Sequence, residues 1–255
     1  MNTMNKTIFT ETYKVRSTQV NLNNQLGLYG VLGMLQDIAA EHASYLGFGY
    51  KQLVKKGFFW ALIQQHLKMD YWPQWNEQIT IKTWSLPVQG VYAFREFELY
   101  WKDKKIGECT STWITIDIQS RKPIELSEQQ EIFFPRTEGG LNFKTQRITL
   151  PEDMYQVNEF PVRVSDLDMN SHVNNVKYSQ WALDMMNERA HREWVIKEYA
   201  INFLSETFMG DQMQGFKSKG RYLNEAHTLV ETYHYAQKVG GVKPAFISHW
   251  TAENI

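Results

Sequence analysis

Two stretches of the chain place apolar residues three and four positions apart, which is the spacing of one face of an α-helix. The first stretch covers residues 28–42 and the second covers residues 176–190. Each predicts one amphipathic helix, whose apolar stripe must be buried against another element. The positions that carry the pattern are Leu28, Val31, Leu32, Leu35, Ile38, Ala39 and His42 in the first stretch, and Val176, Tyr178, Trp181, Ala182, Met185, Met186 and Ala190 in the second.

Runs rich in β-branched and aromatic residues follow both predicted helices, as is typical of β-strands. Turn signals separate neighbouring runs at Lys102–Lys105 in the first half and at Val239–Gly241 in the second. We therefore expect an antiparallel meander after each helix. The predicted strands are Phe58–Met69, Gln78–Trp84, Tyr92–Trp101 and Ile106–Ile118 in the first half, and Glu198–Phe203, Gln212–Tyr222, His227–Gln237 and Lys243–Ala252 in the second.

The two halves are related by an internal repeat. Residues Val15–Leu26 align without a gap with Val162–Val173, and each stretch stands just before a predicted helix. A single helix followed by several strands buries its apolar stripe only if the sheet curls around it. The repeat therefore predicts a tandem α+β fold. The alternative is two unrelated α+β domains whose similarity arose by chance.

The segment between the halves, Ser127–Glu159, has neither the helical nor the strand period. It contains Pro135, Pro151 and the pair Gly139–Gly140, a composition typical of a linker. We therefore expect three parts, which are an N-terminal domain over residues 1–136, a linker over 137–157 and a C-terminal domain over 158–255.

The two copies of the repeat differ in their capacity for acid–base chemistry. At three aligned positions the first copy carries only amides, which neither gain nor lose a proton near neutral pH. The second copy carries a carboxylate, an amide and an imidazole, which indicates one active copy and one copy kept for structure or binding. The aligned sets are Asn21, Asn23 and Gln25 in the first copy, and Asp168, Asn170 and His172 in the second.

The spacing of the second set predicts that its three side chains act together. Residues two apart share a face of an extended segment, so all three would project to one side just before a helix capped by Asn174 or Asn175. The free N–H groups and the positive dipole of that helix start would stabilise a carbonyl oxygen that becomes negative during a reaction. The alternative is a motif of turn and capping residues only, although capping requires no imidazole.

Composition and charge exclude several classes of function. The 255 residues include 27 Lys and Arg against 28 Asp and Glu, and this balance excludes a globally basic nucleic-acid binder. No run of about 18 apolar residues is available to span a membrane, and Met1–Thr10 contains no apolar signal core. The single cysteine, Cys109, can form no internal disulfide. We therefore expect a cytoplasmic protein.

The sequence predicts neither a cofactor nor a metal. His172 and Asp168 are spaced like metal ligands, but no His-x-x-x-His pair or cysteine cluster accompanies them. Gly-rich phosphate loops and the Gly-x-Ser-x-Gly turn of serine hydrolases are absent from the sequence as well.

The stretch Asp166–Tyr178 reads Asp-Leu-Asp-Met-Asn-Ser-His-Val-Asn-Asn-Val-Lys-Tyr. It resembles the signature of the acyl-acyl carrier protein (acyl-ACP) thioesterases of plants and bacteria. The resemblance covers most of the chain, including the Trp72–Trp75 turn, Arg95 and the strand around Trp113. It implies two tandem hotdog domains, in each of which an antiparallel sheet wraps around a central helix. It also implies that the catalytic residues are Asp168, Asn170, His172 and Glu206.

The sequence departs from the plant pattern at Thr207, which stands where plant members of that family have a cysteine. The only cysteine, Cys109, lies in the other half, so a papain-like Cys–His mechanism is excluded for this chain. Glu206 matches the acidic residue that precedes the cysteine in the family. The alternative for Glu206 is a solvated carboxylate at the end of a strand, and the role of Thr207 stays open.

The resemblance implies hydrolysis of fatty acyl-ACP thioesters to free fatty acid and ACP, which ends or diverts fatty acid synthesis. The nucleophile is either a water activated by Glu206, His172 and Asp168, or Asp168 itself through a transient anhydride. The alternatives are an acyl-CoA thioesterase or a dehydratase of the same fold, and a non-catalytic module that binds fatty acyl chains.

An acyl chain needs an apolar slot, which we expect in the non-catalytic N-terminal half, although every candidate residue there is also an ordinary core residue. The expected partner, ACP, is acidic, so a basic surface would assist its docking. Assembly as a monomer or as a homodimer stays open. The candidates for the slot are Leu32, Leu35, Ile38, Phe58, Phe59, Trp60 and Leu62, and the two basic clusters are Lys51, Lys55 and Lys56, and Lys217, Lys219 and Arg221.

Overall fold

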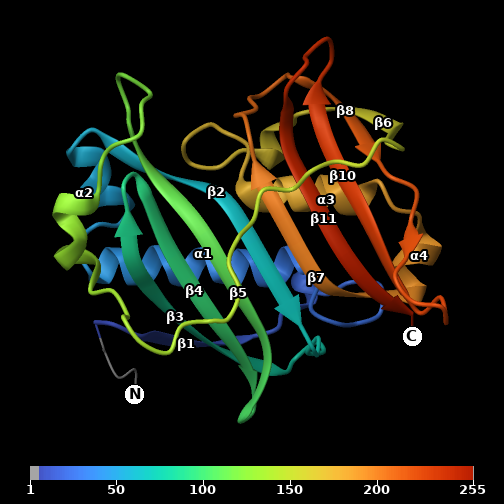
Figure 1. Cartoon of the computed structure of the whole chain (residues 1–255), viewed down its shortest axis with the longest axis horizontal. Coiled ribbons are helices and arrows are strands. Elements are labelled where there is room, and N and C mark those ends of the chain that lie inside the picture. The colour runs from blue at the N-terminus through green and yellow to red at the C-terminus, as the bar shows by residue number, and fades with distance from the viewer. Residues whose placement is uncertain (1–5, 255) are drawn as a thin grey trace. The chain divides into compact units, whose positions relative to one another are not determined.

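The computed structural model describes residues 6–254 and divides the chain into two compact units, Met1–Thr145 and Gln146–Ile255 (Figure 1). The division falls within the segment 137–157 that the sequence predicts as a linker. Residues 1–5 and 255 lie outside the described part of the chain, although the predicted domains include them. Residues 1–5 also belong to the stretch Met1–Thr10, for which the sequence predicts no signal core.

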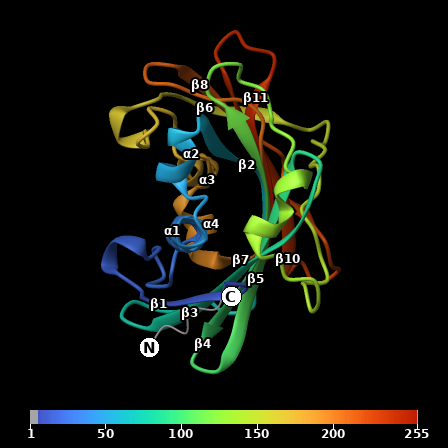
Figure 2. The ribbon, with the colours of Figure 1, turned by 90° about the vertical axis from the view of Figure 1, so that its left-hand side faces the viewer.

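Unit 1 consists of one long helix and an antiparallel sheet. The sheet has the strand order β1-β3-β4-β5-β2, and helix α1 contacts β1 and β3. Figure 2, in which α1 is seen nearly end-on, shows these strands curving around the helix. The elements in chain order are β1 (Phe9–Lys14), η1 (Ser17–Gln19), α1 (Leu28–Tyr45), α2 (Tyr50–Lys55), β2 (Phe58–Met69), β3 (Gln78–Gln89), β4 (Tyr92–Trp101), β5 (Lys104–Asp117) and η2 (Ser127–Phe133).

The core of unit 1 lies between the apolar stripe of α1 and the concave face of the sheet. Leu35 and Ile38 have no exposed surface, and Leu32 is almost fully buried. Of the other residues expected to line a slot, Leu62 is buried, whereas Phe58, Phe59 and Trp60 are half-buried. The helical period of residues 28–42 therefore identified the buried face of α1 correctly.

A buried guanidinium interrupts this apolar core. Arg95 of β4 bonds through Nη1 to Nδ1 of His42 (2.9 Å) and to the Thr83 hydroxyl (3.1 Å). On the other side of the ring, Nε2 of His42 lies 3.0 Å from the carbonyl oxygen of Lys6. Burial and the adjacent guanidinium lower the pKa of His42 to about 4. The imidazole is therefore neutral at pH 7 and accepts a hydrogen bond from Arg95.

Unit 2 repeats the architecture of unit 1. Its sheet has the order β7-β11-β10-β8-β6, with the short β9 paired to β10, and α3 contacts β11. The elements are β6 (Tyr155–Pro161), η3 (Val164–Asp166), α3 (Asn175–Asp184), α4 (Glu188–Glu193), β7 (Trp194–Phe203), β8 (Gln212–Lys217), β9 (Arg221–Tyr222), β10 (Leu229–Lys238) and β11 (Pro244–Asn254).

Each unit is thus an antiparallel sheet around a helix, and the predicted α+β fold of two tandem hotdog domains is confirmed. Two element predictions are wrong. The helix predicted over 176–190 ends at Asp184, because Asn187 accepts a hydrogen bond from the Ala190 N–H and begins a separate helix, α4. The strand predicted over Gln212–Tyr222 breaks after Lys217, where the Lys219 N–H bonds to the Asp153 carboxylate.

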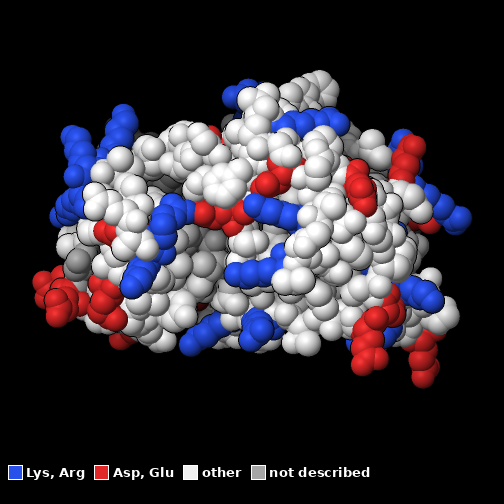
Figure 3. All heavy atoms as spheres, turned by 90° about the horizontal axis from the view of Figure 1, so that it is seen from above, with Lys and Arg blue, Asp and Glu red and all other residues white. Residues whose placement is uncertain are grey.

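Basic side chains gather on unit 1 where α2 lies, at the left-hand edge of Figure 3. Lys51, Lys55 and Lys56, which belong to or directly follow α2, are all exposed. In the second predicted cluster, Arg221 instead forms an ion pair with the buried Glu231. The α2 cluster therefore offers more unneutralised positive charge to an acidic partner.

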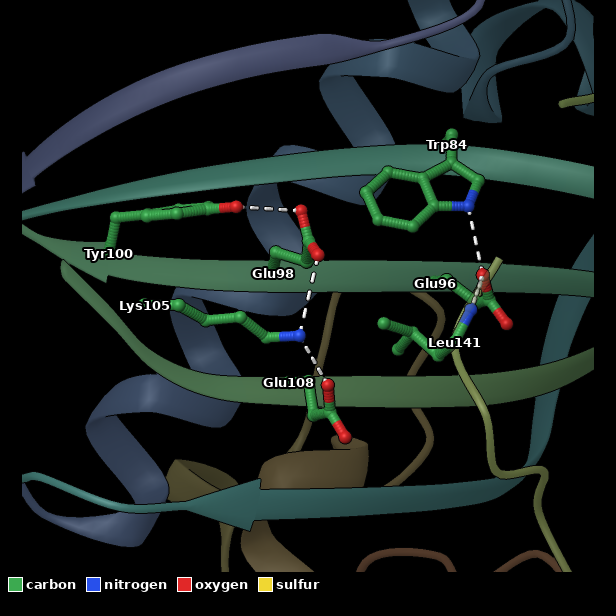
Figure 4. A network of polar contacts seen from close by, with 7 residues as sticks. All are labelled: Trp84, Glu96, Glu98, Tyr100, Lys105, Glu108 and Leu141. Atoms are coloured by element: carbon green, nitrogen blue, oxygen red, sulfur yellow. Dashed lines mark hydrogen bonds and ion pairs between the residues drawn. The ribbon is translucent and has the colours of Figure 1, made fainter. Parts of the chain in front are cut away.

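The segment 135–145 lies across the outer face of the sheet of unit 1 and is bound to it. The Arg136 N–H donates to the Ser85 carbonyl on β3 (2.8 Å), and the hydroxyls of Thr145 and Thr112 are 2.6 Å apart. Between these points, Glu96 accepts hydrogen bonds through Oε2 from the Leu141 N–H (3.0 Å) and the Trp84 indole (2.9 Å), as Figure 4 shows. We call this segment the strap.

A second polar group lies on the same face as Glu96 (Figure 4). Glu98 accepts a hydrogen bond from the Tyr100 hydroxyl (2.9 Å) and forms an ion pair with Lys105, which also pairs with Glu108. These side chains belong to the neighbouring strands β4 and β5, so they reinforce the pairing of these two strands rather than the strap.

Candidate active site

The loop that carries the sequence motif lies between η3 and α3 in unit 2. An antiparallel bridge joins Leu167 to Val173 and closes the loop. Within it the Asp168 N–H donates to the His172 carbonyl (2.8 Å), and Ser171 adopts a left-handed conformation with φ of 61°. The prediction of an extended segment is therefore wrong, because the left-handed residue folds the chain into a tight turn.

The Asp168 carboxylate organises this turn. Its Oδ1 accepts hydrogen bonds from the backbone N–H groups of Asn170 (2.8 Å) and His172 (3.4 Å). Its Oδ2 lies 3.5 Å from the side-chain nitrogen of Asn170. Asp168 and Asn170 are thus brought together, although through the turn and not through a shared strand face. Oδ1 of Asp168 therefore stabilises the turn, as in the alternative interpretation, whereas Oδ2 contacts the side chain of Asn170.

His172 faces a carboxylate from another part of unit 2. Its Nδ1 lies 3.4 Å from Oε1 of Glu206, which belongs to the loop between β7 and β8. The edge of the imidazole also meets the ring of Phe208, with ring centroids 5.0 Å apart. About a quarter of the His172 side chain and two fifths of the Glu206 side chain are exposed, so both can reach a substrate at the surface.

The carboxylate determines which nitrogen of His172 carries the proton. An ionised carboxylate is only an acceptor, so a neutral imidazole beside it keeps its proton on Nδ1. Nε2 then carries the lone pair. The distance of 3.4 Å between Nδ1 of His172 and Oε1 of Glu206 is longer than an ideal hydrogen bond.

The start of α3 lies next to this loop. Asn174 is the N-cap, and its side-chain oxygen accepts a hydrogen bond from the Val176 N–H (2.9 Å). Of the two N-caps that the sequence allows, the structure therefore selects Asn174. The positive end of the α3 dipole lies directly after His172 in the chain, where it favours negative charge.

A pair of hydroxyl groups joins helix α3 to the loop that carries Glu206. The hydroxyls of Tyr178 on α3 and Thr207 are 2.7 Å apart, and both residues are buried. Burial, followed by the charges of Glu206 and Asp168, raises the pKa of Tyr178 to about 12. The sequence identified Tyr178 as a core position of a helix and as the last residue of the signature Asp166–Tyr178, and no sequence signal connects it with Thr207.

Unit 1 contains the same turn without ionisable groups. Oδ1 of Asn21 accepts hydrogen bonds from the N–H groups of Asn23 (2.9 Å) and Gln25 (3.1 Å), and Asn24 has φ of 59°. The amide oxygen of Asn21 thus does what Oδ1 of Asp168 does in unit 2. The turn geometry therefore does not require a carboxylate.

The repeat also identifies the counterpart of Glu206. The Leu26 N–H donates to the Pro73 carbonyl in unit 1 (2.7 Å), as the Val173 N–H donates to the Thr207 carbonyl in unit 2 (3.1 Å). Trp72, which precedes Pro73, therefore matches Glu206 and is almost fully buried. Unit 1 has an indole where unit 2 has the carboxylate.

The described residues give little support for a metal site, a cysteine nucleophile or a membrane-spanning helix. Between residues 6 and 254 no three His, Cys, Asp or Glu side chains are grouped so that they could hold a metal ion. Cys109 has no exposed surface, and burial raises the pKa of its thiol, so it is no nucleophile at neutral pH. None of the helices in this range combines the length and the apolar character that a membrane crossing requires.

Two plant proteins and one solved structure are among the known proteins to which this chain is similar. A dodecanoyl-ACP hydrolase of Cinnamomum camphora is 24% identical over 92% of this chain and 65% of its own length. A palmitoyl-ACP thioesterase of Arabidopsis thaliana is 27% identical over 69% of this chain and 47% of its own length. The chain therefore spans less than two thirds of these relatives. A crystal structure of an acyl-ACP thioesterase from Bacteroides thetaiotaomicron matches 99% of this chain and 100% of its own, with a TM-score of 0.85 and 26% identity.

Family models account for almost the whole chain. The N-terminal domain of acyl-ACP thioesterases matches residues 6–132, and the C-terminal domain of the same family matches residues 150–252. Each model falls on one of the two structural units, apart from the residues that join them. The chain belongs to the acyl-ACP thioesterase family.

Proposed function

We propose that this protein hydrolyses fatty acyl-ACP thioesters to free fatty acid and ACP, a reaction that ends or diverts fatty acid synthesis. The observation that carries the proposal is the His172–Glu206 pair, which unit 2 holds beside the Asp168 turn. Unit 1 has the same turn with only amides and an indole. Membership of the family supplies the substrate class.

In the proposed reaction the His172–Glu206 pair acts as a general base. Glu206 holds the proton on Nδ1, so Nε2 removes a proton from water as the water oxygen attacks the thioester carbonyl carbon. The tetrahedral intermediate then collapses with cleavage of the C–S bond. The imidazolium returns its proton to the departing sulfur, which leaves as a thiol, and the acid is released. A positioned base of this kind typically contributes about 10²–10⁴-fold to the rate.

Asn170 is the proposed ligand of the carbonyl oxygen. Its side-chain nitrogen lies 3.5 Å from Oδ2 of Asp168, which orients the amide and leaves the second N–H of the amide for substrate. Together with the positive end of α3, this amide would stabilise the oxyanion of the intermediate. One well-placed donor contributes about 3–4 kcal/mol to such a transition state.

Direct attack by Asp168 is the alternative for the nucleophilic step. We propose water, because Oδ1 of Asp168 already accepts two backbone N–H groups, as the inert Asn21 does in unit 1. A single turnover in H₂¹⁸O separates the two routes. Attack by water places ¹⁸O in the fatty acid alone, whereas hydrolysis of an anhydride of Asp168 places ¹⁸O in the protein in at least part of the molecules.

A thiol-release assay tests the activity itself. Acyl-ACP and acyl-CoA of the same chain length are supplied separately, and free thiol is measured against time. Release from acyl-ACP at a higher kcat/KM than from acyl-CoA is the expected result. Preference for acyl-CoA would favour the acyl-CoA thioesterase alternative. Tight fatty-acid binding without thiol release from either substrate would favour a non-catalytic binding module.

Unit 1 is the proposed holder of the acyl chain, and α2 is its proposed docking surface for ACP. The helix α1 and its sheet bury large apolar side chains such as Leu35 and Ile38, and burial of each CH₂ of an acyl chain contributes about 0.8 kcal/mol. The exposed side chains of Lys51, Lys55 and Lys56 would attract an acidic carrier.

We propose the cytoplasm as the location, because a chain with one buried free cysteine is suited to a reducing compartment. The names of the plant relatives place those proteins in the chloroplast. Assembly as a homodimer is a further proposal that sedimentation velocity tests directly. A single species at the mass of one chain, 30.1 kDa, would contradict it.

A further inference from the structure

The carboxylate of Glu206 lies less deeply in the fold than the side chain at the same place in unit 1. Its side chain is two fifths exposed, whereas the indole of Trp72, at the same place in unit 1, is almost fully buried. A buried indole is held by the surrounding core, but a half-exposed carboxylate has several rotamers to choose from. Fixing the backbone that carries Glu206 therefore limits the positions that its carboxylate can take.

That backbone is attached to unit 2 at the next residue. The Thr207 carbonyl accepts a hydrogen bond from the Val173 N–H (3.1 Å), which ties the loop of Glu206 to the loop of His172. The Thr207 hydroxyl lies 2.7 Å from the hydroxyl of Tyr178. Thr207 has no exposed surface and Tyr178 is almost fully buried, so water does not compete for this second bond.

Comparison of the two units shows which of these two hydrogen bonds the repeat needs in order to fold. Unit 1 keeps the backbone bond, from the Leu26 N–H to the Pro73 carbonyl, but has Val31 and Pro73 where unit 2 has Tyr178 and Thr207. A valine and a proline form no hydroxyl bond. The repeat therefore folds without this bond, which is present in the unit that has Glu206 in place of the indole.

We propose that the Tyr178–Thr207 hydrogen bond is a positioning device for Glu206, which holds its carboxylate against Nδ1 of His172. Tyr178 and Thr207 act through Glu206 and touch no reacting atom. This inference rests on the proposed function for its effect on the rate, but its effect on His172 is observable without any substrate.

The bond persists over the whole range in which the enzyme would work. Burial keeps the pKa of Tyr178 near 12, so the phenol remains protonated and available as a donor at neutral pH. The Thr207 hydroxyl has no charged state in this range. The device is therefore a fixed support and not a pH switch.

Three variants test the proposal. Tyr178→Phe and Thr207→Val each remove the hydrogen bond and keep the shape of the side chain, and Thr207→Ser retains a hydroxyl. A displacement of about 1 Å in a catalytic group can cost up to about 100-fold. We expect Tyr178→Phe and Thr207→Val each to lower kcat about tenfold with KM nearly unchanged. The double variant should lose no more than Tyr178→Phe alone, since Tyr178→Phe already removes the hydroxyl pair and the contact of the phenol with the Thr207 backbone, which Thr207→Val keeps. Thr207→Ser should keep most of the activity.

The matched control is Tyr199→Phe. The Tyr199 hydroxyl donates to Ser179, the neighbour of Tyr178 on α3, at 2.8 Å, and it is equally buried. This variant removes a buried tyrosine hydrogen bond from the same helix without touching the loop of Glu206. We expect a similar loss of thermal stability and an unchanged kcat.

The ¹⁵N chemical shifts of the His172 ring provide a readout that a purely structural role would not change. In the wild type we expect the proton of the neutral ring on Nδ1, opposite Glu206. In Tyr178→Phe and Thr207→Val the proton should move toward Nε2, as in Glu206→Gln, while Tyr199→Phe keeps the wild-type signals.

The outcomes of these measurements test the positioning role and the proposed function separately. Unchanged ring shifts in both Tyr178→Phe and Thr207→Val, each shown to be folded by its unfolding transition, would overturn the positioning role. Changed ring shifts with an unchanged kcat in a wild-type-active enzyme would overturn it as well. If the wild-type protein releases no thiol at all, the proposed function fails, but the ring shifts still decide whether Tyr178 and Thr207 position Glu206.

Discussion

At the scale of single residues, the two units provide matched pairs in which only the chemistry differs. Asn21 and Asp168 accept the same two backbone N–H groups, through an amide oxygen in one unit and a carboxylate oxygen in the other. Gln25 and His172 occupy the same place in the turn. A substitution that copies the residue of unit 1 into unit 2 therefore removes an ionisable group while it keeps the turn.

The variants Asp168→Asn and His172→Gln each place the residue type of unit 1 at the matching position of unit 2. We expect each to lower kcat/KM for an acyl-ACP at least 100-fold, because the carboxylate or the base is lost. The melting temperature should remain nearly unchanged, because unit 1 folds with these amides. Steady-state thiol release and thermal unfolding measure the two effects. The control is Asn23→Ala in the inert turn, which should leave the kinetics as they are. Activity that survives both changes in unit 2 would refute the site assignment.

His42 predicts how stability depends on pH. Its pKa is lowered from 6.5 to about 4 in the folded state, mainly by burial and then by Arg95. Between these values the unfolded chain binds a proton that the folded chain does not. Stability should therefore fall as the pH is lowered from about 6.5 to 4, by about 1.4 kcal/mol per pH unit for this group at most.

Denaturant unfolding at pH 7 and pH 5 measures this effect. The matched variant is His42→Gln, whose amide can still accept from Arg95 and donate to the Lys6 carbonyl but does not titrate. We expect a smaller difference in unfolding free energy between the two pH values in the variant than in the wild type. His234 is also buried, and its pKa is lowered to about 3, so the His42→Gln variant retains the pH dependence that comes from unit 2. Equal pH dependence of both proteins would contradict the role of His42.

At the scale of elements, the strap shows that a segment without regular structure can be firmly bound. Both the Leu141 N–H and the Trp84 indole donate to the same oxygen of Glu96, which is 2% exposed. This acceptor atom therefore joins the middle of the strap to the sheet of unit 1 (Figure 4). Burial raises the pKa of this Glu96 carboxylate.

Glu96→Gln and Glu96→Leu separate the acceptor from the charge. Because a single carbonyl oxygen can accept both hydrogen bonds, Glu96→Gln should keep the strap in place. Glu96→Leu leaves two buried donors without this partner and should release the middle of the strap, between its attachments at Arg136 and Thr145. Hydrogen–deuterium exchange of residues 137–143 measures this, with faster exchange expected only in the leucine variant. Release in Glu96→Gln would mean that the charge, and not the acceptor, holds the strap.

At the scale of the whole molecule, the distribution of surface charge bears on the proposed docking of ACP. The net charge of −1 provides no general attraction for an acidic protein, so a local cluster must provide it. Lys51, Lys55 and Lys56 form such a cluster at α2 (Figure 3), whereas the second cluster includes Arg221, which already pairs with Glu231.

Charge reversal of Lys51, Lys55 and Lys56 to glutamate tests the docking surface. We expect the KM for acyl-ACP to rise about tenfold or more at low salt, because positive charge mainly accelerates the encounter with an acidic partner. The same reversal of Lys217 and Lys219 serves as the control and should change KM little. An unchanged KM in the α2 variant would exclude this surface as the docking site.

The sequence by itself determined where the central helices and most of the strands form, because periodicity is a local property of the chain. It also placed Asp168, Asn170 and His172 in one short segment before a helix, since they are neighbours in the chain. The repeat of Val15–Leu26 in Val162–Val173 predicted the matching turns, because aligned backbones with similar polar side chains form similar hydrogen bonds.

Only the tertiary structure decided what faces what. The contact of His172 with Glu206, the hydroxyl pair of Tyr178 and Thr207, and the anchoring of the strap by Glu96 all join residues far apart in the chain. Such contacts depend on how helix and sheet pack in three dimensions, and no spacing along the chain encodes them. Ser171 shows the same limit locally, because its left-handed backbone turned a segment that alternation predicted as extended into a closed loop.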